Sequence, residues 1–211
     1  MRITIAQLNP IVGDIAGNLA RLRETVTQSL PARPDLIVFP ELFLVGYPPR
    51  DLLERPWFIE RTRAAIEQIR DFSTGFPETG ILFGAPTPTG ETAGKGLYNS
   101  AVLIAGGKVL ASRAKTLLPT YDVFDEERHF DPSRQIGVVP FKGERLGLSI
   151  CEDAWNDPAL WPRGRMYTRD PIAELAAAGA TLLINLSASP FTMGKEELRY
   201  RLISRHARRH G

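Results

Sequence analysis

Short apolar runs rich in β-branched residues alternate along this chain with segments in which apolar residues recur at helical spacing. The first kind of segment predicts buried strands, and the second predicts amphipathic helices. Strands are predicted over residues 2–7, 35–39, 81–84, 100–105, 109–111, 136–141, 146–150 and 181–185. Helices are predicted over residues 19–30, 57–72, 171–178 and 194–210. This alternation favours a layered α/β domain over a helix bundle or a sandwich without helices.

Several element ends carry local signals of their own. Asn18 is predicted to cap the first helix and Pro31 to close it, while Asp170 is predicted to cap the third helix. The glycine pair at 106–107 predicts a hairpin turn between two strands. The apolar side of the last helix is predicted to consist of Leu198, Leu202 and Ile203.

The composition describes an ordinary globular domain, with 43% hydrophobic and 24% charged residues and a formal net charge of +2 over 211 residues. This near-neutral balance gives no reason to expect nucleic-acid or membrane binding. Residues 1–10 place polar side chains where a signal peptide would be apolar, and no apolar run approaches the roughly 18 to 20 residues of a membrane span. We therefore expect a soluble cytoplasmic protein.

The scattered titratable residues do not predict a metal site. The histidines at 129, 206 and 210 lie far apart in the sequence, and the chain has one cysteine. The acids over residues 122–127 predict a solvated loop rather than a cation site. The arginines over residues 199–209 predict a solvated or interface face of the last helix rather than a nucleic-acid contact.

Three ionisable residues follow predicted strands, where an α/β sheet gathers side chains from distant parts of the chain. They are Glu41, Lys115 and Cys151. A thiol needs a base to remove its proton, a carboxylate provides one, and a lysine offsets the negative charge of an oxyanion. Taken singly, each residue has another interpretation: a packed cysteine, a glutamate that caps a helix after residues 48–49, and an exposed loop lysine.

Four strings in the chain together resemble the nitrilase superfamily of carbon-nitrogen hydrolases. They are FPEL at 39–42, KTLLPTYDVFDEERHF at 115–130, LSICEDAW at 148–155, and LSASPF at 186–191 with Lys195 after it. The second, third and fourth strings are similar specifically to the glutaminase domains of glutamine-dependent NAD synthetases. The resemblance covers the chain from its first strand to its last helix.

This resemblance implies roles for seven residues. Glu41 matches the family's general base, Lys115 its catalytic lysine and Cys151 its nucleophile. A second glutamate near the lysine is matched better by Glu126 than by the adjacent Glu127. The substrate-binding residues implied by the resemblance are Tyr121, Ser189 and Lys195. Without the resemblance, Tyr121 could simply pack its loop, Ser189 could be a turn residue and Lys195 a solvated charge.

The resemblance also implies a nitrilase-like four-layer αββα sandwich that spans residues 1–211 and is incomplete at its C-terminus. The glutaminase step would need no cofactor, and its substrate would be L-glutamine. ATP and nicotinic acid adenine dinucleotide would bind a synthetase domain that is absent from this chain. Because a sheet without its last strands exposes an unpaired edge, we expect a homo-oligomer.

Two other functions remain open on the sequence. One is a free-standing nitrilase-like amidase or carbamoylase that acts on another small amide. The other is a non-enzymatic module in which the cysteine is buried and inert.

Overall fold

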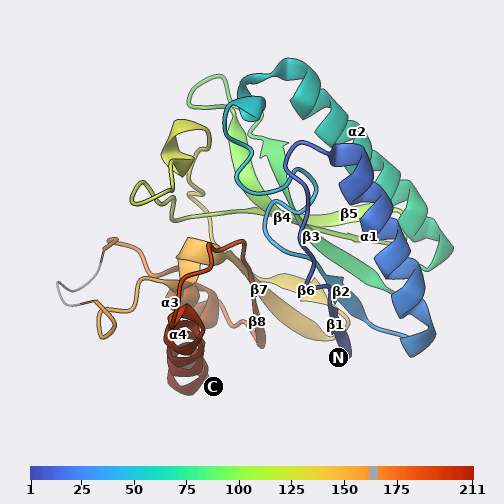
Figure 1. Ribbon diagram of the computed structural model, residues 1–211. Helices are drawn as coiled ribbons and strands as arrows, with labels where there is room; N and C mark the ends of the chain where they lie inside the picture. The colour runs from blue at the N-terminus through green and yellow to red at the C-terminus, as the bar shows by residue number, and fades with distance from the viewer. Residues whose placement is uncertain (162–165) are drawn as a thin grey trace.

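The computed structural model describes residues 1–161 and 166–211. The α-helices are α1 (Ile15–Ser29), α2 (Pro56–Phe72), α3 (Pro171–Ala177) and α4 (Lys195–His210). The strands are β1 (Ile3–Ile5), β2 (Leu36–Val38), β3 (Gly80–Pro88), β4 (Leu97–Ala105), β5 (Lys108–Ala114), β6 (Val139–Phe141), β7 (Glu144–Ile150) and β8 (Leu182–Leu186). Figure 1 shows how these elements are arranged.

The strands form two separate sheets. The first has the order β1-β2-β3-β4-β5, in which β1, β2 and β3 run parallel and β4 and β5 follow as antiparallel hairpins. The second has the order β6-β7-β8, with β6 antiparallel and β8 parallel to β7. Each sheet therefore has parallel strands whose carboxyl ends point the same way.

Helices cover the outer face of each sheet, so the layers run helix, sheet, sheet, helix (Figure 1). Leu22 of α1 and Ile69 of α2 share one apolar cluster with Phe83 of the first sheet. The inner faces of the sheets meet through a second cluster that includes Leu103 and Ile150. Full burial of a leucine, isoleucine or phenylalanine side chain contributes about 1.5–3 kcal/mol. On the other side, α3 packs on β7 and β8, and α4 packs on α3. The predicted αββα fold class is confirmed.

Every predicted element is present, but one predicted cap is wrong. Asp14, not Asn18, caps α1: its Oδ1 accepts from the backbone N–H of Gly17 at 2.9 Å. Asn18 lies inside the helix and is buried, and its Nδ2 donates to the carbonyls of Ile11 at 2.8 Å and Leu44 at 3.3 Å. Asp and Asn cap equally well, so residue preference alone does not favour Asn18 over Asp14, four residues earlier.

Other differences concern element ends. The strand predicted over 136–141 begins only at Val139, and β3 continues to Pro88, beyond its predicted end. Asp170 caps α3 as predicted, accepting from Ala173 N at 3.1 Å. In α4 Leu202 is buried, but Ile203 is exposed, so the predicted apolar side is narrower. Within the part of the chain that the structure describes, none of the helices combines the length and the apolar character that crossing a bilayer requires.

Candidate active site

The segments that follow three strands meet at one end of the sandwich. β2 leads to Glu41, β5 ends directly before Lys115, and β7 ends directly before Cys151. Gly84 in β3 lets the first of these segments cross close to the sheet, because a Cβ at this position would lie 2.0 Å from the backbone nitrogen of Leu42. Any side chain at residue 84 would displace Glu41, so the absence of a Cβ helps to position this carboxylate.

Lys115 lies between two carboxylates in the protein interior. Its Nζ donates to Glu41 Oε1 and to Glu126 Oε1, each at 2.8 Å, and Lys115 is 1% exposed. Burial disfavours the ammonium, but Glu41 and Glu126 outweigh it, so the pKa of Lys115 lies well above its usual value. Lys115 is therefore a fixed buried cation, and the interpretation as an exposed loop charge is wrong.

Of the two adjacent acids, Glu126 turns inward and Glu127 is exposed. The hydroxyl of Tyr47 also donates to Glu126 Oε1, at 2.9 Å. Burial raises the pKa of Glu126, while the ammonium of Lys115 opposes the rise. The prediction of a solvated loop over 122–127 therefore does not hold at Glu126.

Glu41 is held at both of its carboxylate oxygens. Besides Lys115, its Oε1 accepts from Asn99 Nδ2 at 2.8 Å, and its Oε2 accepts from the backbone N–H of Ala188 at 3.0 Å. The turn after Pro49 has no side-chain cap, so Glu41 does not act as one. These contacts fix the direction of the Glu41 carboxylate within the cluster.

Cys151 lies beside this cluster at a sharp turn of the backbone. It follows β7 with a φ of 41° and begins a 3₁₀ turn, η5 (Cys151–Ala154). Left-handed φ is uncommon for residues other than glycine and is often found at functional sites. Burial raises the pKa of the Cys151 thiol to about 12, with the carboxylate of Glu41 adding to the rise and Lys115 opposing it. At rest the thiol is protonated, so its reaction requires a base.

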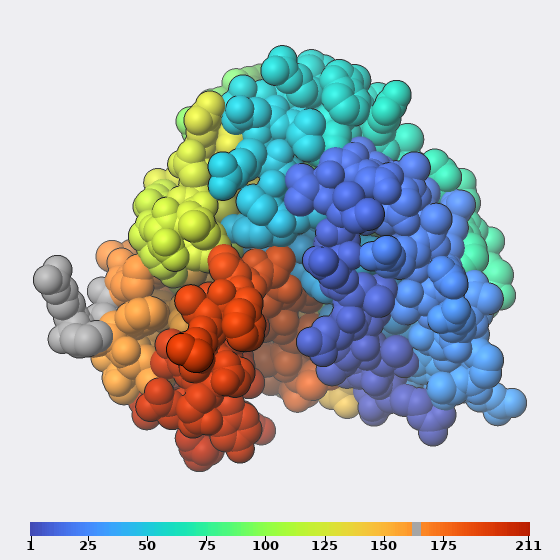
Figure 2. Space-filling view, viewed as in Figure 1, coloured from blue at the N-terminus to red at the C-terminus, as the bar shows by residue number. Residues whose placement is uncertain are grey.

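A cavity of about 280 Å³ opens onto the thiol and contains the predicted substrate-binding residues. Its lining includes Cys151, Tyr121, Ser189 and Lys195. In Figure 2 the segment around residues 115–130, in yellow-green, lies against the orange and red C-terminal segments on this side of the molecule. Larger hollows of about 420 and 550 Å³ adjoin this cavity, but the thiol of Cys151 lines neither.

The three substrate-binding candidates differ in their contacts. The hydroxyl of Tyr121 lies 3.0 Å from each carboxylate oxygen of Glu152. Lys195 Nζ donates weakly to the carbonyl of Pro190 at 3.3 Å and lies 5.7 Å from the centroid of the Trp155 ring. Ser189 is half-buried in the loop after β8. Four of the seven predicted site residues, Cys151, Tyr121, Ser189 and Lys195, therefore line this cavity. Glu126 lines the adjoining hollow of about 420 Å³, and the side chains of Glu41 and Lys115 are fully buried in the cluster with it.

Sequence reasoning missed Glu152, which directly follows Cys151 and lines the same cavity. Tyr121 and Tyr167 both donate to its carboxylate at 3.0 Å. Burial raises the pKa of Glu152, and these two hydrogen bonds oppose the rise. Asn99 was missed too, although a lone amide in an apolar strand was a signal for a buried polar contact.

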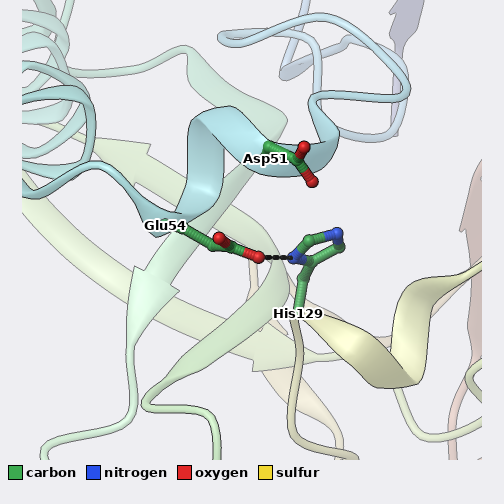
Figure 3. A group of neighbouring side chains, drawn as sticks. All are labelled: Asp51, Glu54 and His129. Atoms are coloured by element: carbon green, nitrogen blue, oxygen red, sulfur yellow. Dashed lines mark ion pairs between the residues drawn. The ribbon is translucent and has the colours of Figure 1, made fainter.

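A second group of titratable side chains lies on the surface and not in this cleft. Within residues 1–161 and 166–211, the ligand atoms of Asp51, Glu54 and His129 come within 4.8 Å of one another (Figure 3). The guanidinium of Arg128 already lies 3.7 Å from Asp51 and 3.5 Å from Glu54. We interpret this group as a surface ion-pair network.

The model of the carbon-nitrogen hydrolase family matches residues 2–208. The chain belongs to the carbon-nitrogen hydrolase family. As a member of this family it is a hydrolase, and the buried cluster beside the cysteine is its candidate active site.

Among curated relatives, the glutamine-dependent NAD(+) synthetase of Synechocystis sp. is 41% identical over 98% of this chain and 37% of its own length. The enzyme of the same name from Thermotoga maritima is 38% identical over 98% of this chain and 33% of its length. The chain therefore spans about a third of the length of the curated relatives it matches.

Solved structures show the same fold. A glutamine-dependent NAD+ synthetase from Acinetobacter baumannii superposes with a TM-score of 0.81 and 30% identity, over 97% of this chain and 35% of the other. An amidase from Nesterenkonia sp. superposes with a TM-score of 0.78 and 25% identity, over 98% of this chain and 71% of the other.

Proposed function

We propose that this chain hydrolyses the side-chain amide of glutamine to glutamate and ammonia through a thioester on Cys151. One observation carries the proposal: a buried lysine is held 2.8 Å from each of two glutamates beside the single cysteine of the chain. The names of the relatives, which are glutamine-dependent enzymes, support glutamine as the substrate.

The first step is attack on the amide carbon by the sulfur of Cys151. Because burial raises the pKa of this thiol to about 12, the proton must leave as the S–C bond forms. Glu41 is the proposed general base, because its negative charge lies close enough to Cys151 to raise the pKa of the thiol. Hydrogen bonds from Asn99 Nδ2 and the backbone N–H of Ala188 fix its carboxylate.

The negative charge then develops on the amide oxygen. Lys115 is the proposed stabiliser of this oxyanion, together with a backbone N–H just after Cys151. The protonated Glu41 gives its proton to the leaving ammonia. Water, activated by the same carboxylate, hydrolyses the thioester and releases glutamate. Glu126 keeps Lys115 charged and oriented through the cycle.

The other end of glutamine is proposed to lie against Tyr121, Ser189 and Lys195. Lys195 would pair with the α-carboxylate. Because Lys195 lies in the first turn of α4, where the helix dipole disfavours a cation, the negative charge of the α-carboxylate would also offset this unfavourable interaction. Glu152 lies in the same cavity and would accept the α-ammonium. Glutamine carries both an α-ammonium and an α-carboxylate, and the lining of the cavity offers the carboxylate of Glu152 for the first and the ammonium of Lys195 for the second.

The wider role rests on the relatives' names alone. We propose that residues 1–211 act as the glutaminase part of a cytoplasmic, homo-oligomeric NAD synthetase. Its synthetase domain would use the ammonia to amidate nicotinic acid adenine dinucleotide with ATP. The glutaminase step itself is proposed to need only the chain's own side chains.

A free-standing amidase is the second candidate, because the Nesterenkonia amidase shares the fold over most of its own length. Steady-state assays with glutamine, asparagine, a simple aliphatic amide and a nitrile separate the two. Preference for glutamine by kcat/KM supports a glutaminase. A higher kcat/KM for the aliphatic amide or the nitrile would reject the proposed substrate.

A further inference from the structure

The carboxylate of Asp153 joins two backbone segments that no strand pairing connects. Its Oδ1 accepts from the backbone N–H groups of Thr116 at 2.9 Å and Leu117 at 2.8 Å. Its Oδ2 accepts from the backbone N–H of Ile150 at 3.0 Å. Asp153 is 3% exposed, so these three donors replace the water that the carboxylate would otherwise bind.

The residues on either side of this contact are the reacting ones. Thr116 and Leu117 directly follow Lys115, and Ile150 directly precedes Cys151. Lys115 follows the first sheet and Cys151 follows the second, and the two sheets are not hydrogen-bonded to each other. One short side chain therefore spans the joint between the layer that carries the ammonium and the layer that carries the thiol.

We propose that Asp153 is a positioning residue that sets the spacing between Lys115 and the Cys151 thiol in the hydrolysis proposed above. It acts through the backbone and does not touch the substrate. The inference rests on the proposed function, because the spacing matters only if the thiol attacks and the ammonium stabilises the product of that attack. A misplacement of about 1 Å at such a pair can lower the rate about 10²-fold.

Asp157 provides a matched control in the same part of the chain. It too is buried, and its carboxylate accepts from Arg205 Nε at 2.7 Å and from the backbone N–H of Ala159 at 2.9 Å. None of these partners adjoins Lys115 or Cys151. Loss of the Asp157 carboxylate therefore tests the general effect of removing a buried acid.

The experiment compares Asp153→Asn, Asp153→Ala and Asp157→Asn with the unaltered chain. An asparagine at 153 keeps one acceptor oxygen, so it can serve the Thr116 and Leu117 donors or the Ile150 donor, but not both. Glutamine kcat and KM are measured per reactive thiol, together with the rate of Cys151 alkylation by iodoacetamide and thermal unfolding. Since the chain has one cysteine, alkylation reports on the site alone.

We expect Asp153→Asn to lower kcat per thiol about 10²-fold with little change in KM, and to slow alkylation in parallel. A folded Asp153→Ala variant should show a larger fall in kcat per thiol, because it keeps neither acceptor oxygen. Asp157→Asn should lower the unfolding temperature and leave both rates per thiol unchanged. Rates for Asp153→Asn equal to those of the unaltered chain would overturn the positioning role and leave the glutaminase standing. An unaltered chain that neither turns over glutamine nor alkylates would overturn both.

Discussion

The two ends of the candidate site are built differently. At the reacting end, Glu41, Lys115 and Glu126 are buried and hold one another at hydrogen-bond distance. At the proposed substrate end, Tyr121 is 36% exposed and Lys195 makes one weak hydrogen bond to a carbonyl. The first arrangement is preorganised, so it stabilises charge without rearrangement. The second is more open to solvent, and its Tyr121 hydroxyl is hydrogen-bonded to the carboxylate of Glu152.

The reacting residues and the proposed substrate-binding residues come from different parts of the fold. Glu41, Lys115 and Cys151 follow strands, so their positions come from the two packed sheets, while Glu126 lies on the short turn after residue 125. Tyr121 and Ser189 lie on loops, which tolerate more movement. Substitutions at the reacting end should therefore change kcat and stability, and substitutions at the substrate end should change KM.

The largest effect is expected for Cys151→Ala. Without the sulfur no thioester forms, so glutamine turnover should be abolished, while calorimetry should still detect glutamine binding in the substrate end of the cavity. Turnover near the normal rate in this variant would show that Cys151 is not the nucleophile.

Lys115→Met should lower kcat by about 10²–10³-fold, the effect of removing one oxyanion donor. It should also destabilise the fold by about 3–5 kcal/mol near pH 7, because two buried carboxylates lose their cation. Lys142→Met, which removes an exposed lysine paired with Glu78, should cost at most about 1 kcal/mol. Urea unfolding and steady-state assays provide both measurements. Equal effects of the two substitutions would contradict the preorganised cluster.

The loss of stability in Lys115→Met should shrink as pH falls. Burial raises the folded-state pKa of Glu126 above its unfolded value. The folded state therefore binds a proton more tightly than the unfolded state, and acidification favours folding at this group. Removal of Lys115, whose ammonium opposes the rise in the pKa of Glu126, should increase this stabilisation by acid. Unfolding free energies at pH 7 and pH 5 check the sign, and a larger loss at pH 5 would be inconsistent with it.

Glu152→Gln should raise KM for glutamine roughly tenfold or more, because a hydrogen bond to a charged group is worth about 1.5–3 kcal/mol, and kcat should change less. An analogue of glutamine without the α-amino group separates the causes. The unaltered chain should lose affinity for the analogue, and the variant should lose little further. Glu127→Gln, at the exposed neighbouring acid, serves as the control and should leave KM unchanged.

Ser189→Ala should give the smallest change, a rise in KM of roughly two- to tenfold with kcat unaltered, as expected for one neutral hydrogen bond of about 0.5–1.5 kcal/mol. Ser133→Ala is a matched control, since that hydroxyl bonds the carbonyl of Gln135 away from the cleft. A drop in kcat rather than a rise in KM would contradict the substrate-binding role and assign Ser189 to the reacting groups.

Much of the architecture could be predicted from local patterns. Apolar periodicity predicted each α-helix and strand, because a chain that packs in two sheets and two helix layers must place apolar residues at strand or helix spacing. The ends of the predicted strands pointed to Glu41, Lys115 and Cys151. Element ends were less certain, as the cap at Asp14 shows, because several residues near a helix start can cap it.

The contacts inside the site could not be predicted in the same way. Local pattern does not separate Glu126 from Glu127, and only the family resemblance favoured Glu126. The short turn after residue 125 directs the Glu126 side chain inward. The partners of Glu152 lie 15 and 31 residues away, and two of the three donors to Asp153 lie 36 and 37 residues away. Such contacts depend on how the two sheets are placed together, which no local pattern encodes.

The central claim is most directly tested by labelling the chain with a diazo-ketone analogue of glutamine and locating the adduct by mass spectrometry. We predict one label per chain on Cys151, slower labelling when glutamine is present, and slower labelling in Glu41→Ala. A folded chain whose Cys151 stays unlabelled, or is labelled at the same rate with and without glutamine, would contradict it.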